Sequence, residues 1–570
     1  MQNQVVLFML LFDLIWNICL VALKITMTLM TEYSYKIFSR NFLLNLVLIS
    51  GFIGISCTEE RVQQSAPQNP NVLFIIADDF GAHDMSAFGS DFYETPHLDS
   101  LASQSMIFAN GYAAARVCSP SRASIMSGKN PTRHGITDYI GAPVGEEWRD
   151  WGRHTKLLPP DYERSLPHNY TVLPEALKIE GYTTFFAGKW HLGSEGSYPE
   201  NHGFDYNEGG FESGGPYTGG YFSPFNNPKM EDYPDELGMS YSEKLAKETS
   251  DFIRQNSKRP FLAFLSFYAV HAPIQTTEAY WQKYRDKAER LGIAENGFEM
   301  GYFLPIRTEQ DNPVYAGLIQ HMDDAVGQVL NTLEEMEVDD ETIVIFTSDH
   351  GGVAAGDDYA TSNKPLQGGK GTQYEGGLKV PYFINVPWLN LQGDENDTPV
   401  TGTDFYPTIL DLVGADLRPN EHIDGVSLKP LLEGGEIDNR LLFWHYPHYG
   451  NQGGRPSSIV RDGRWKLIRY HADSTEVLYD LSTDIGEQEN VYANHPDVAE
   501  RLGKELTNYL DKTNATFPMA DPQYDPEAEA RHLESVENEL LPRLEQQRLE
   551  FLSPDYSPGN EWWGSEPGEE

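Results

Sequence analysis

Four apolar runs of strand length recur along the chain, and they constrain its fold more than any other feature. They lie at residues 71–77, 183–187, 261–270 and 342–347. Because these runs do not alternate apolar with polar residues, each is predicted to be a strand buried on both faces, as in a parallel sheet covered by helices. Helix-like stretches separate the runs, at 173–180, 242–255 and 315–336. This alternation predicts an α/β domain over residues 71–435.

The pattern changes at Leu441. Shorter strand-like runs follow at 441–446, 458–461, 465–470 and 476–481, and a helix-like stretch at 496–512. Asp462-Gly463 lies between two of the runs and is typical of a hairpin turn. We therefore predict a smaller α+β subdomain with an antiparallel sheet over residues 436–515. Residues 516–570 form an acidic extension, in which Pro542 is predicted to interrupt a helix-like stretch at 528–552 and the last residues to be loose.

The N-terminus contains two apolar segments, at 5–23 and 42–56. The second follows Lys36 and Arg40 and ends at Cys57, an arrangement typical of a lipoprotein signal with Cys57 as the lipidated residue. A transmembrane anchor or helical hairpin is the alternative. We expect residues 1–57 to be a signal segment, residues 58–70 a linker, and the protein to be exported to the periplasm or cell surface. A lipid or signal anchor would then be its contact with the membrane.

The formal net charge of −43 argues against nucleic acid as a partner, because few basic residues are present to neutralise phosphates. The same charge would repel an anionic substrate. An anionic substrate therefore requires a locally basic site or a salty habitat that screens the charge.

Ionisable side chains follow the end of every apolar run. They are Asp78 and Asp79, Lys189 and His191, His271, and Asp349 and His350. Each alone is explained by a helix cap or a hydrogen-bonded core residue. Together they predict a ligand site, because the carboxyl ends of parallel strands share one edge of a sheet and unpaired buried charges are costly.

The residue types at this edge favour a hard cation and an anion. Three carboxylates suit Ca²⁺ or Mg²⁺, whereas no Cys/His cluster indicates Zn²⁺. Arg122, Lys189 and Lys370 would contact the anion, and the glycines around Lys370 permit close backbone approach.

Cys118 lies in the run Cys118-Ser119-Pro120-Ser121-Arg122, with Gly128 downstream. The other two cysteines, Cys19 and Cys57, belong to the apolar N-terminal segments, so Cys118 has no disulfide partner in the body of the chain. A lone thiol is often inert core packing. However, this run and the run Gly181–His191 resemble two motifs of the sulfatase family, and the resemblance extends over about residues 71–515.

The resemblance implies an alkaline-phosphatase-like large domain and a nucleophile made by oxidising Cys118 to formylglycine (3-oxoalanine), which requires a maturase. It implies a Ca²⁺ site at Asp78, Asp79, Cys118, Asp349 and His350, in preference to Mg²⁺, with His350 in a place that is usually Asn or Gln. Lys189 and Lys370 would hold the sulfate, His271 would protonate the departing alcohol, His191 would remove the proton of the second hydroxyl, and Arg122 would position the formylglycine.

Four further residues are predicted to border the substrate: His134, His445, His448 and Arg455. Surface or interdomain packing explains them equally well. An exported acidic sulfatase suggests sulfated algal polysaccharides, such as ulvan or carrageenan fragments, as substrates. A phosphatase or phosphonate monoester hydrolase with the same fold, and a non-catalytic polysaccharide-binding lipoprotein, remain alternatives.

Overall fold

The computed structural model describes residues 65–558 and 563–564. The predicted signal segment 1–57, its Cys57, and residues 58–64 of the predicted linker lie outside the described residues. Within the described part of the chain, no helix is both long enough and apolar enough to cross a lipid bilayer.

An eight-stranded sheet forms the centre of the large domain, in the order β13-β2-β12-β11-β1-β7-β5-β6. The four apolar runs are its adjacent strands β11 (Thr342–Ser348), β1 (Asn71–Ala77), β7 (Phe261–Ser266) and β5 (Thr183–Gly188). These four strands are parallel, whereas β12 (Tyr382–Asn385) is antiparallel to β11. Three short strands complete the sheet: β2 (Met106–Phe108), and at the two edges β6 (Tyr206–Glu208) and β13 (Asp394–Asn396). The mostly parallel sheet confirms the predicted α/β class.

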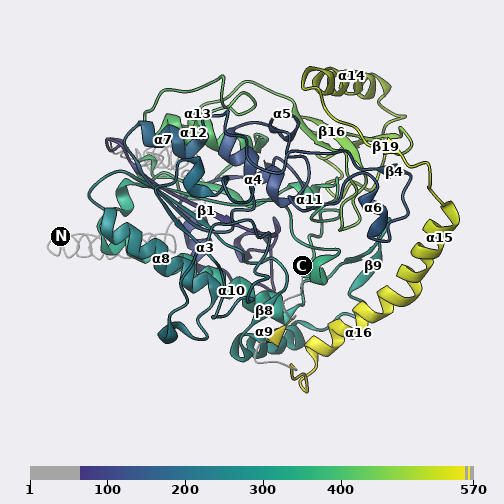
Figure 1. Cartoon of the computed structure of the whole chain (residues 1–570), viewed down its shortest axis with the longest axis horizontal. Helices are drawn as coiled ribbons and strands as arrows, with labels where there is room; N and C mark the ends of the chain where they lie inside the picture. Colours follow the sequence, from purple (N-terminus) through teal and green to yellow (C-terminus); the bar gives the residue numbers. More distant parts are fainter. Residues whose placement is uncertain (1–64, 559–562, 565–570) are drawn as a thin grey trace, which may run out of the picture. The chain divides into compact units, whose positions relative to one another are not determined.

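Helices cover both faces of this sheet (Figure 1). Leu73 and Ile75 of β1 pack into one core, and Phe74 and Ile76 pack into the other. The first core is closed by α8 (Tyr241–Asn256) and α10 (Pro313–Glu335), and the second by α4 (Cys118–Ser127), α7 (Leu173–Ile179) and α12 (Phe405–Leu412). Burial on both faces explains why the four runs show no polar alternation.

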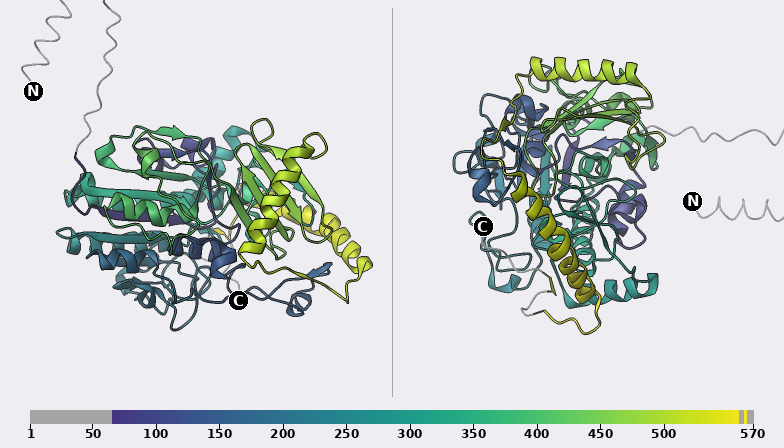
Figure 2. Two further views of the ribbon diagram at one scale, coloured as in Figure 1. Left: turned by 90° about the horizontal axis from the view of Figure 1, so that it is seen from above. Right: turned by 90° about the vertical axis from the view of Figure 1, so that its right-hand side faces the viewer.

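The smaller C-terminal domain contains an antiparallel sheet, as predicted. Its strands are β15 (Leu442–Tyr446), β16 (Ser457–Asp462), β17 (Trp465–Tyr470) and β18 (Glu476–Asp480), paired in that order. Helix α14 (Pro496–Lys512) packs on one face of the sheet (Figure 2). The other face meets Tyr112 and Leu378 of the large domain, so this interface continues the protein core.

The acidic extension folds back onto the large domain. Helix α15 (Pro526–Ser535), a π-helical turn η8 (Val536–Leu540) and α16 (Leu541–Leu552) follow one another without a break (Figure 1). The predicted interruption at Pro542 is therefore wrong: Pro542 lies at the start of α16, where its missing N–H is tolerated after the π turn. Leu544 packs against Phe298, and Arg548 is buried beside Asp311.

Candidate active site

The ionisable residues that follow the apolar runs lie at the same edge of the sheet. Asp78 and Asp79 follow β1, and Asp349 and His350 follow β11. Lys189 follows β5, and His271 comes a few residues after β7. Because these four strands are adjacent and parallel, residues as far apart in sequence as Asp79 and Asp349, 270 positions, meet.

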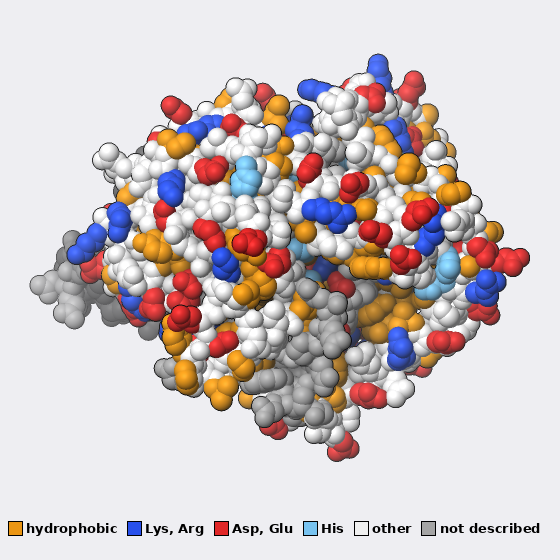
Figure 3. All heavy atoms as spheres, viewed as in Figure 1, with side chains coloured by type: hydrophobic (Ala, Val, Ile, Leu, Met, Phe, Trp, Pro, Cys, Tyr) orange, Lys and Arg blue, Asp and Glu red, His pale blue; other side chains and the backbone are white. Residues whose placement is uncertain are grey.

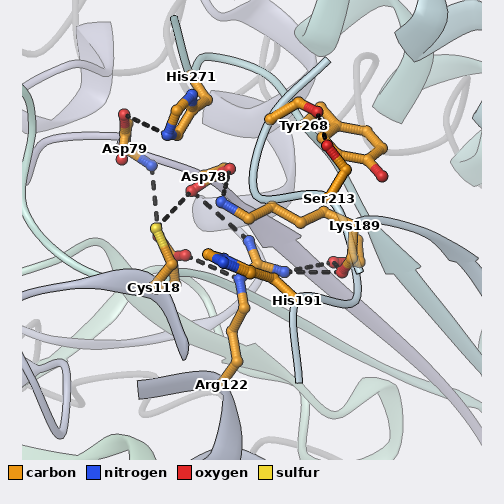
Figure 4. A network of polar contacts seen from close by, with 12 residues as sticks. Asp78, Asp79, Cys118, Arg122, Lys189, His191, Ser213, Tyr268 and His271 are labelled. Atoms are coloured by element: carbon orange, nitrogen blue, oxygen red, sulfur yellow. Dashed lines mark hydrogen bonds and ion pairs between the residues drawn. The ribbon is translucent and has the colours of Figure 1, made fainter. Parts of the chain in front are cut away.

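The three carboxylates of this cluster are fully buried, and each contacts a basic side chain. Lys189 Nζ lies 2.5 Å from Asp78 Oδ2, and Lys370 Nζ lies 2.9 Å from Asp79 Oδ1. Arg122 Nε donates to Asp349 Oδ2 over 2.8 Å. Arg122 also donates to the Lys189 carbonyl and to Ser266 Oγ, which fixes its position beneath the cluster (Figure 4).

Cys118 begins helix α4 and points into the cluster (Figure 4). Its Sγ lies 3.3 Å from His350 Nε2 and 3.7 Å from Asp78 Oδ1. Burial opposes ionisation of the thiol, but Lys189, Lys370 and His350 outweigh burial and lower the pKa of Cys118 well below its usual range. The cluster therefore stabilises negative charge at position 118.

Gly128 ends helix α4 in the left-handed conformation, with φ of 63°. A Cβ at this position would lie 2.4 Å from the Cβ of His422, so the close packing here requires glycine. The helix that carries Cys118 and Arg122 is thus fixed at both ends.

Lys370 reaches the cluster from a glycine-rich loop. A Cβ on Gly369 would lie 2.4 Å from the carbonyl oxygen of Gly352, so this loop can pass close to the strand-end backbone only with glycine. Lys370 Nζ contacts Asp79, Asp357 at 3.0 Å and His271 Nε2 at 3.2 Å.

The hydrogen bonds of two histidines define their tautomers. His271 Nδ1 lies 2.6 Å from the Ala272 carbonyl, which can only accept, so Nδ1 carries the proton and Nε2 faces Lys370. His191 Nε2 donates to the Ile140 carbonyl over 2.9 Å, and its buried Nδ1 has no hydrogen-bond partner among the described residues. Burial lowers the pKa of His191 although Cys118 opposes this, so His191 is held neutral with a free lone pair.

The donor set fits a divalent metal ion. Ligand atoms of Asp78, Cys118, Asp349 and His350 all lie within 4.8 Å of one another, and all four residues are buried. Asp79 Oδ1 lies near Lys370 but receives no hydrogen bond of good geometry. Burial and the charge of Asp349 raise the pKa of Asp78, whereas His350 and Arg122 overcome burial and lower the pKa of Asp349. A cation would relieve the repulsion between these carboxylates.

Asp357 is a residue of the site that sequence reasoning missed. Its carboxylate contacts Lys370 and accepts a hydrogen bond from Gln452 Nε2 over 2.7 Å. Asp357, Asp358 and Tyr359 have φ of 37°, 68° and 49°, a strained left-handed run of non-glycine residues. The Asp357-Asp358 pair beside Gly356 was the available signal, but it does not directly follow a strand-like apolar run, so nothing in the sequence assigned it to the edge of the sheet.

The four predicted substrate residues contact other side chains. His134 contacts Ser124 and the Ile136 amide, and burial lowers its pKa to about 3. His445 contacts Ser458 and the Thr516 carbonyl. His448 contacts the hydroxyl of Thr137. Arg455 forms an ion pair with Asp473 and lies over the rings of Tyr302 and Tyr470. These contacts do not bring the four residues to the Cys118 cluster, and their role in substrate binding stays a prediction.

Comparisons with known proteins agree with this geometry. Residues 70–415 match the family model described as Sulfatase, and residues 369–515 match N-sulphoglucosamine sulphohydrolase, C-terminal. A sulfatase of Formosa agariphila is 30% identical over 82% of this chain and 94% of its own length. The N-acetylgalactosamine-6-sulfatase of Homo sapiens is 29% identical over 67% of this chain and 69% of its own.

A crystal structure of Ps i-CgsB in complex with k-i-k-neocarrahexaose superposes with a TM-score of 0.63 at 23% identity, covering 84% of this chain and all of that one. It has the same fold. From the family model and the Formosa relative, the chain belongs to the sulfatase family and is a sulfuric ester hydrolase.

Proposed function

We propose that this sulfatase removes sulfate from sulfated oligo- or polysaccharides of algal type, such as ulvan or carrageenan fragments. The observation that carries the proposal is the buried convergence of three carboxylates, Cys118 and two lysines at one sheet edge. The sugar in the Ps i-CgsB structure and the name of the human relative support a sulfated carbohydrate as the substrate class.

Ca²⁺ is the proposed metal, because it accepts an irregular set of oxygen ligands more readily than Mg²⁺. Asp78, Asp79, Asp349 and His350 would hold it. When bound, the cation supplies positive charge that stabilises sulfate oxygens and lowers the pKa of a nearby hydroxyl.

Cys118 is the proposed precursor of formylglycine. The conversion breaks the Cβ–S bond, releases the sulfur and forms an aldehyde C=O, and a separate maturase supplies the oxidising equivalents. The hydrated aldehyde would offer one hydroxyl as the nucleophile toward sulfur and keep a second hydroxyl for release of the product.

The surrounding side chains have distinct tasks. Lys189 and Lys370 hold the sulfate oxygens by charge-assisted hydrogen bonds. His271 would pass a proton through Nε2 to the departing alcohol oxygen, with the neighbouring Lys370 ammonium, 3.2 Å away, as the donor to Nε2. His191 accepts a proton at its free Nδ1. Arg122 holds Asp349 and the strand ends in position.

The mass of the tryptic peptide 117–122 tests the nucleophile directly. Protein made in a host with a formylglycine-generating system should give a peptide about 18 Da lighter than the cysteine form, from replacement of SH and H by oxygen. The same preparation should release sulfate from ulvan or carrageenan oligosaccharides over many turnovers, and Cys118→Ser should not. Sustained turnover by Cys118→Ser, or faster hydrolysis of phosphate esters than sulfate esters, would overturn the proposal.

We further propose that the protein is exported and lipid-anchored at Cys57. The basic and apolar residues before Cys57 support this. Labelling with a radioactive fatty acid should mark the full chain and not Cys57→Ser, which should leave the membrane fraction. Equal labelling of both proteins would contradict the anchor.

A further inference from the structure

Acidic side chains are scattered among basic ones over the face of the protein shown in Figure 3. Asp357 differs from an ordinary surface carboxylate, because its Oδ2 lies 3.0 Å from Nζ of the buried Lys370. The carboxylates of Asp78, Asp79 and Asp349 are completely buried, whereas the Asp357 side chain is 31% exposed. Asp357 therefore lies between the Cys118 cluster and solvent, and the proposed reaction steps do not use its carboxylate.

The ammonium group of Lys370 has three close partners. Its Nζ lies 2.9 Å from Asp79 Oδ1, 3.0 Å from Asp357 Oδ2 and 3.2 Å from His271 Nε2. An ammonium group carries three N–H bonds at fixed angles, so the partners of two of them set the direction of the third. Asp79 is proposed to bind the cation, so the N–H that faces Asp79 is available to the sulfate. Asp357 is then the carboxylate that remains to direct Lys370 toward His271.

The imidazole of His271 is already held in the orientation that accepts this N–H. Its Nδ1 donates to the Ala272 carbonyl over 2.6 Å, so the lone pair of Nε2 faces Lys370. The ring of Tyr217 meets the His271 ring edge-on, with centroids 5.9 Å apart and planes at 82°. The freedom that remains in the pair belongs to the flexible lysine side chain, and a contact of the ammonium restricts it most directly.

Two further contacts hold the turn that carries Asp357. Gln452 Nε2 of the C-terminal domain donates to Asp357 Oδ2 over 2.7 Å. The Ile274 amide, three residues after His271, donates to Asp358 Oδ2 over 3.2 Å. The left-handed backbone of the turn is costly for residues other than glycine and persists only where its surroundings fix it. The turn therefore connects the C-terminal domain with both residues of the proposed proton donor.

Asp357 carries the negative charge that this role requires. Burial opposes its ionisation, but the charges of Lys370 and His271 outweigh burial and lower the pKa of Asp357 below its ordinary value. Its hydrogen bond from Lys370 is thus charge-assisted, which makes it stronger and more directional than a contact between neutral groups.

We propose that Asp357 is a positioning residue, which holds the Lys370 ammonium so that one N–H points at His271 Nε2. The inference rests on the proposed function and deepens it. Cleavage of the S–O bond leaves its electron pair on the alcohol oxygen. A proton from Lys370 reaches that oxygen through His271 Nε2, and the neutral lysine amine then takes a proton from water. Asp357 acts through Lys370 and exchanges no proton itself.

The dependence of the rate on the leaving group tests this role. A sugar alcohol needs a proton as it leaves, whereas 4-nitrophenolate leaves as a stable anion. The wild type and Asp357→Asn, both made in a host with a formylglycine-generating system, are assayed on a sulfated carrageenan oligosaccharide and on 4-nitrophenyl sulfate. Asp357→Asn should lower kcat/KM for the oligosaccharide about 10- to 100-fold more than for 4-nitrophenyl sulfate, which is part of what a well-placed proton donor contributes. The loss should appear in kcat rather than in KM.

Three variants separate positioning from general damage. Asp357→Glu keeps the carboxylate and should recover part of the loss on the oligosaccharide. Gln452→Leu removes the hydrogen bond that holds Asp357, so it should change the ratio of the two kcat/KM values in the same direction, but less. It also carries the test if Asp357→Asn does not fold. The exposed Asp340→Asn should match the wild type.

Equal losses on both substrates in Asp357→Asn would overturn the positioning role and leave the sulfatase proposal standing. If the wild type accepts only aryl esters, phenyl sulfate replaces the oligosaccharide and the same ratio decides. If it accepts only the oligosaccharide, the solvent deuterium isotope effect on kcat decides: it should rise in Asp357→Asn, and an unchanged value would overturn the role. A wild type with formylglycine that hydrolyses none of these esters would instead contradict the proposed function.

Discussion

Two buried clusters of charge in this protein differ in how their charges are satisfied. One is the Cys118 cluster at the strand ends. The other, the junction cluster, consists of Glu375, Lys466 and Glu487 at the contact between the two domains. Lys466 Nζ lies 2.9 Å from Glu375 and 2.8 Å from Glu487, and all three residues are almost completely buried.

Most of the polar atoms of the junction cluster are paired with one another. Tyr112 donates its hydroxyl proton to Glu375 over 2.5 Å, and the Glu375 amide donates to Glu487 over 2.6 Å. Burial raises the pKa of Glu487 to about 7, so its carboxyl is easily neutralised. The Cys118 cluster leaves buried atoms of three residues, Asp79, Arg122 and His191, without hydrogen-bond partners within the described residues, whereas the junction cluster leaves one, Oε1 of Glu487, which lies 2.8 Å from Lys466 Nζ. The comparison teaches that the junction cluster stabilises the fold, whereas the Cys118 cluster is organised for a ligand.

Asp349→Asn should show the largest effect on activity. Loss of one carboxylate from the Cys118 cluster should lower kcat/KM at least about 10³-fold, because metal binding and charge stabilisation are lost together. The melting temperature without added metal should fall less than in Lys466→Met, because the relief of repulsion on Asp78 offsets part of the lost pairing with Arg122. Steady-state kinetics and thermal melts check both effects, with the exposed Asp340→Asn as the control. A large loss of stability with little loss of activity would reverse the comparison.

Lys466→Met should act in the opposite way. It leaves Glu375 and Glu487 buried without their cation, which should lower the free energy of unfolding by about 3–5 kcal/mol. Activity per folded molecule should change less than tenfold, because Lys466 does not belong to the Cys118 cluster. Urea denaturation followed by activity in native buffer measures both quantities. The exposed Lys504→Met should match the wild type, and equal stability of the two variants would disprove a stabilising role for the junction cluster.

Removal of the metal ion distinguishes the clusters further. Chelation should lower the melting temperature of the wild type, since an ion present at 100 times its Kd stabilises the folded state by about 2.7 kcal/mol. Asp349→Asn should lose this shift, and Lys466→Met should keep it. If chelation lowered the melting temperature of all three proteins by the same amount, the ion would bind outside the Cys118 cluster.

Glu487→Gln should have the smallest effect, visible as a change in pH dependence. The folded-state pKa of Glu487, about 7, lies above its ordinary value, so the folded protein binds the proton more tightly. This contribution to stability is present below the ordinary pKa and is lost as pH rises toward 7. Between pH 5 and 7 the wild type should therefore lose about 2 kcal/mol relative to Glu487→Gln. Urea denaturation at each pH measures the free energy of unfolding of both proteins. If that free energy changed with pH by the same amount in the wild type and in Glu487→Gln, the assignment would be contradicted.

The sequence predicted the central strands and most of the Cys118 cluster for one reason. The four runs are buried on both faces, so hydrophobicity alone revealed them, and their polar residues had to meet at the carboxyl edge. The short strands β2, β6 and β13 were missed because three residues carry too little pattern.

Other features depended on long-range packing. Asp357 reaches Lys370 through a strained turn whose path no local pattern encodes. His134 and His445 acquire hydrogen-bond partners that the sequence did not indicate, and their role in substrate binding stays a prediction. Pro542 was expected to break a helix that a π turn keeps continuous.

The sequence by itself determined the α/β architecture, the family motifs and the kinds of side chain at the strand ends. Only the tertiary structure decided which buried charges are paired, such as Lys466 with Glu375 and Lys370 with Asp79. The physical reason is that hydrophobic periodicity is a local property of the chain. Pairing instead depends on segments far apart in sequence, and those segments meet only when the whole core is packed.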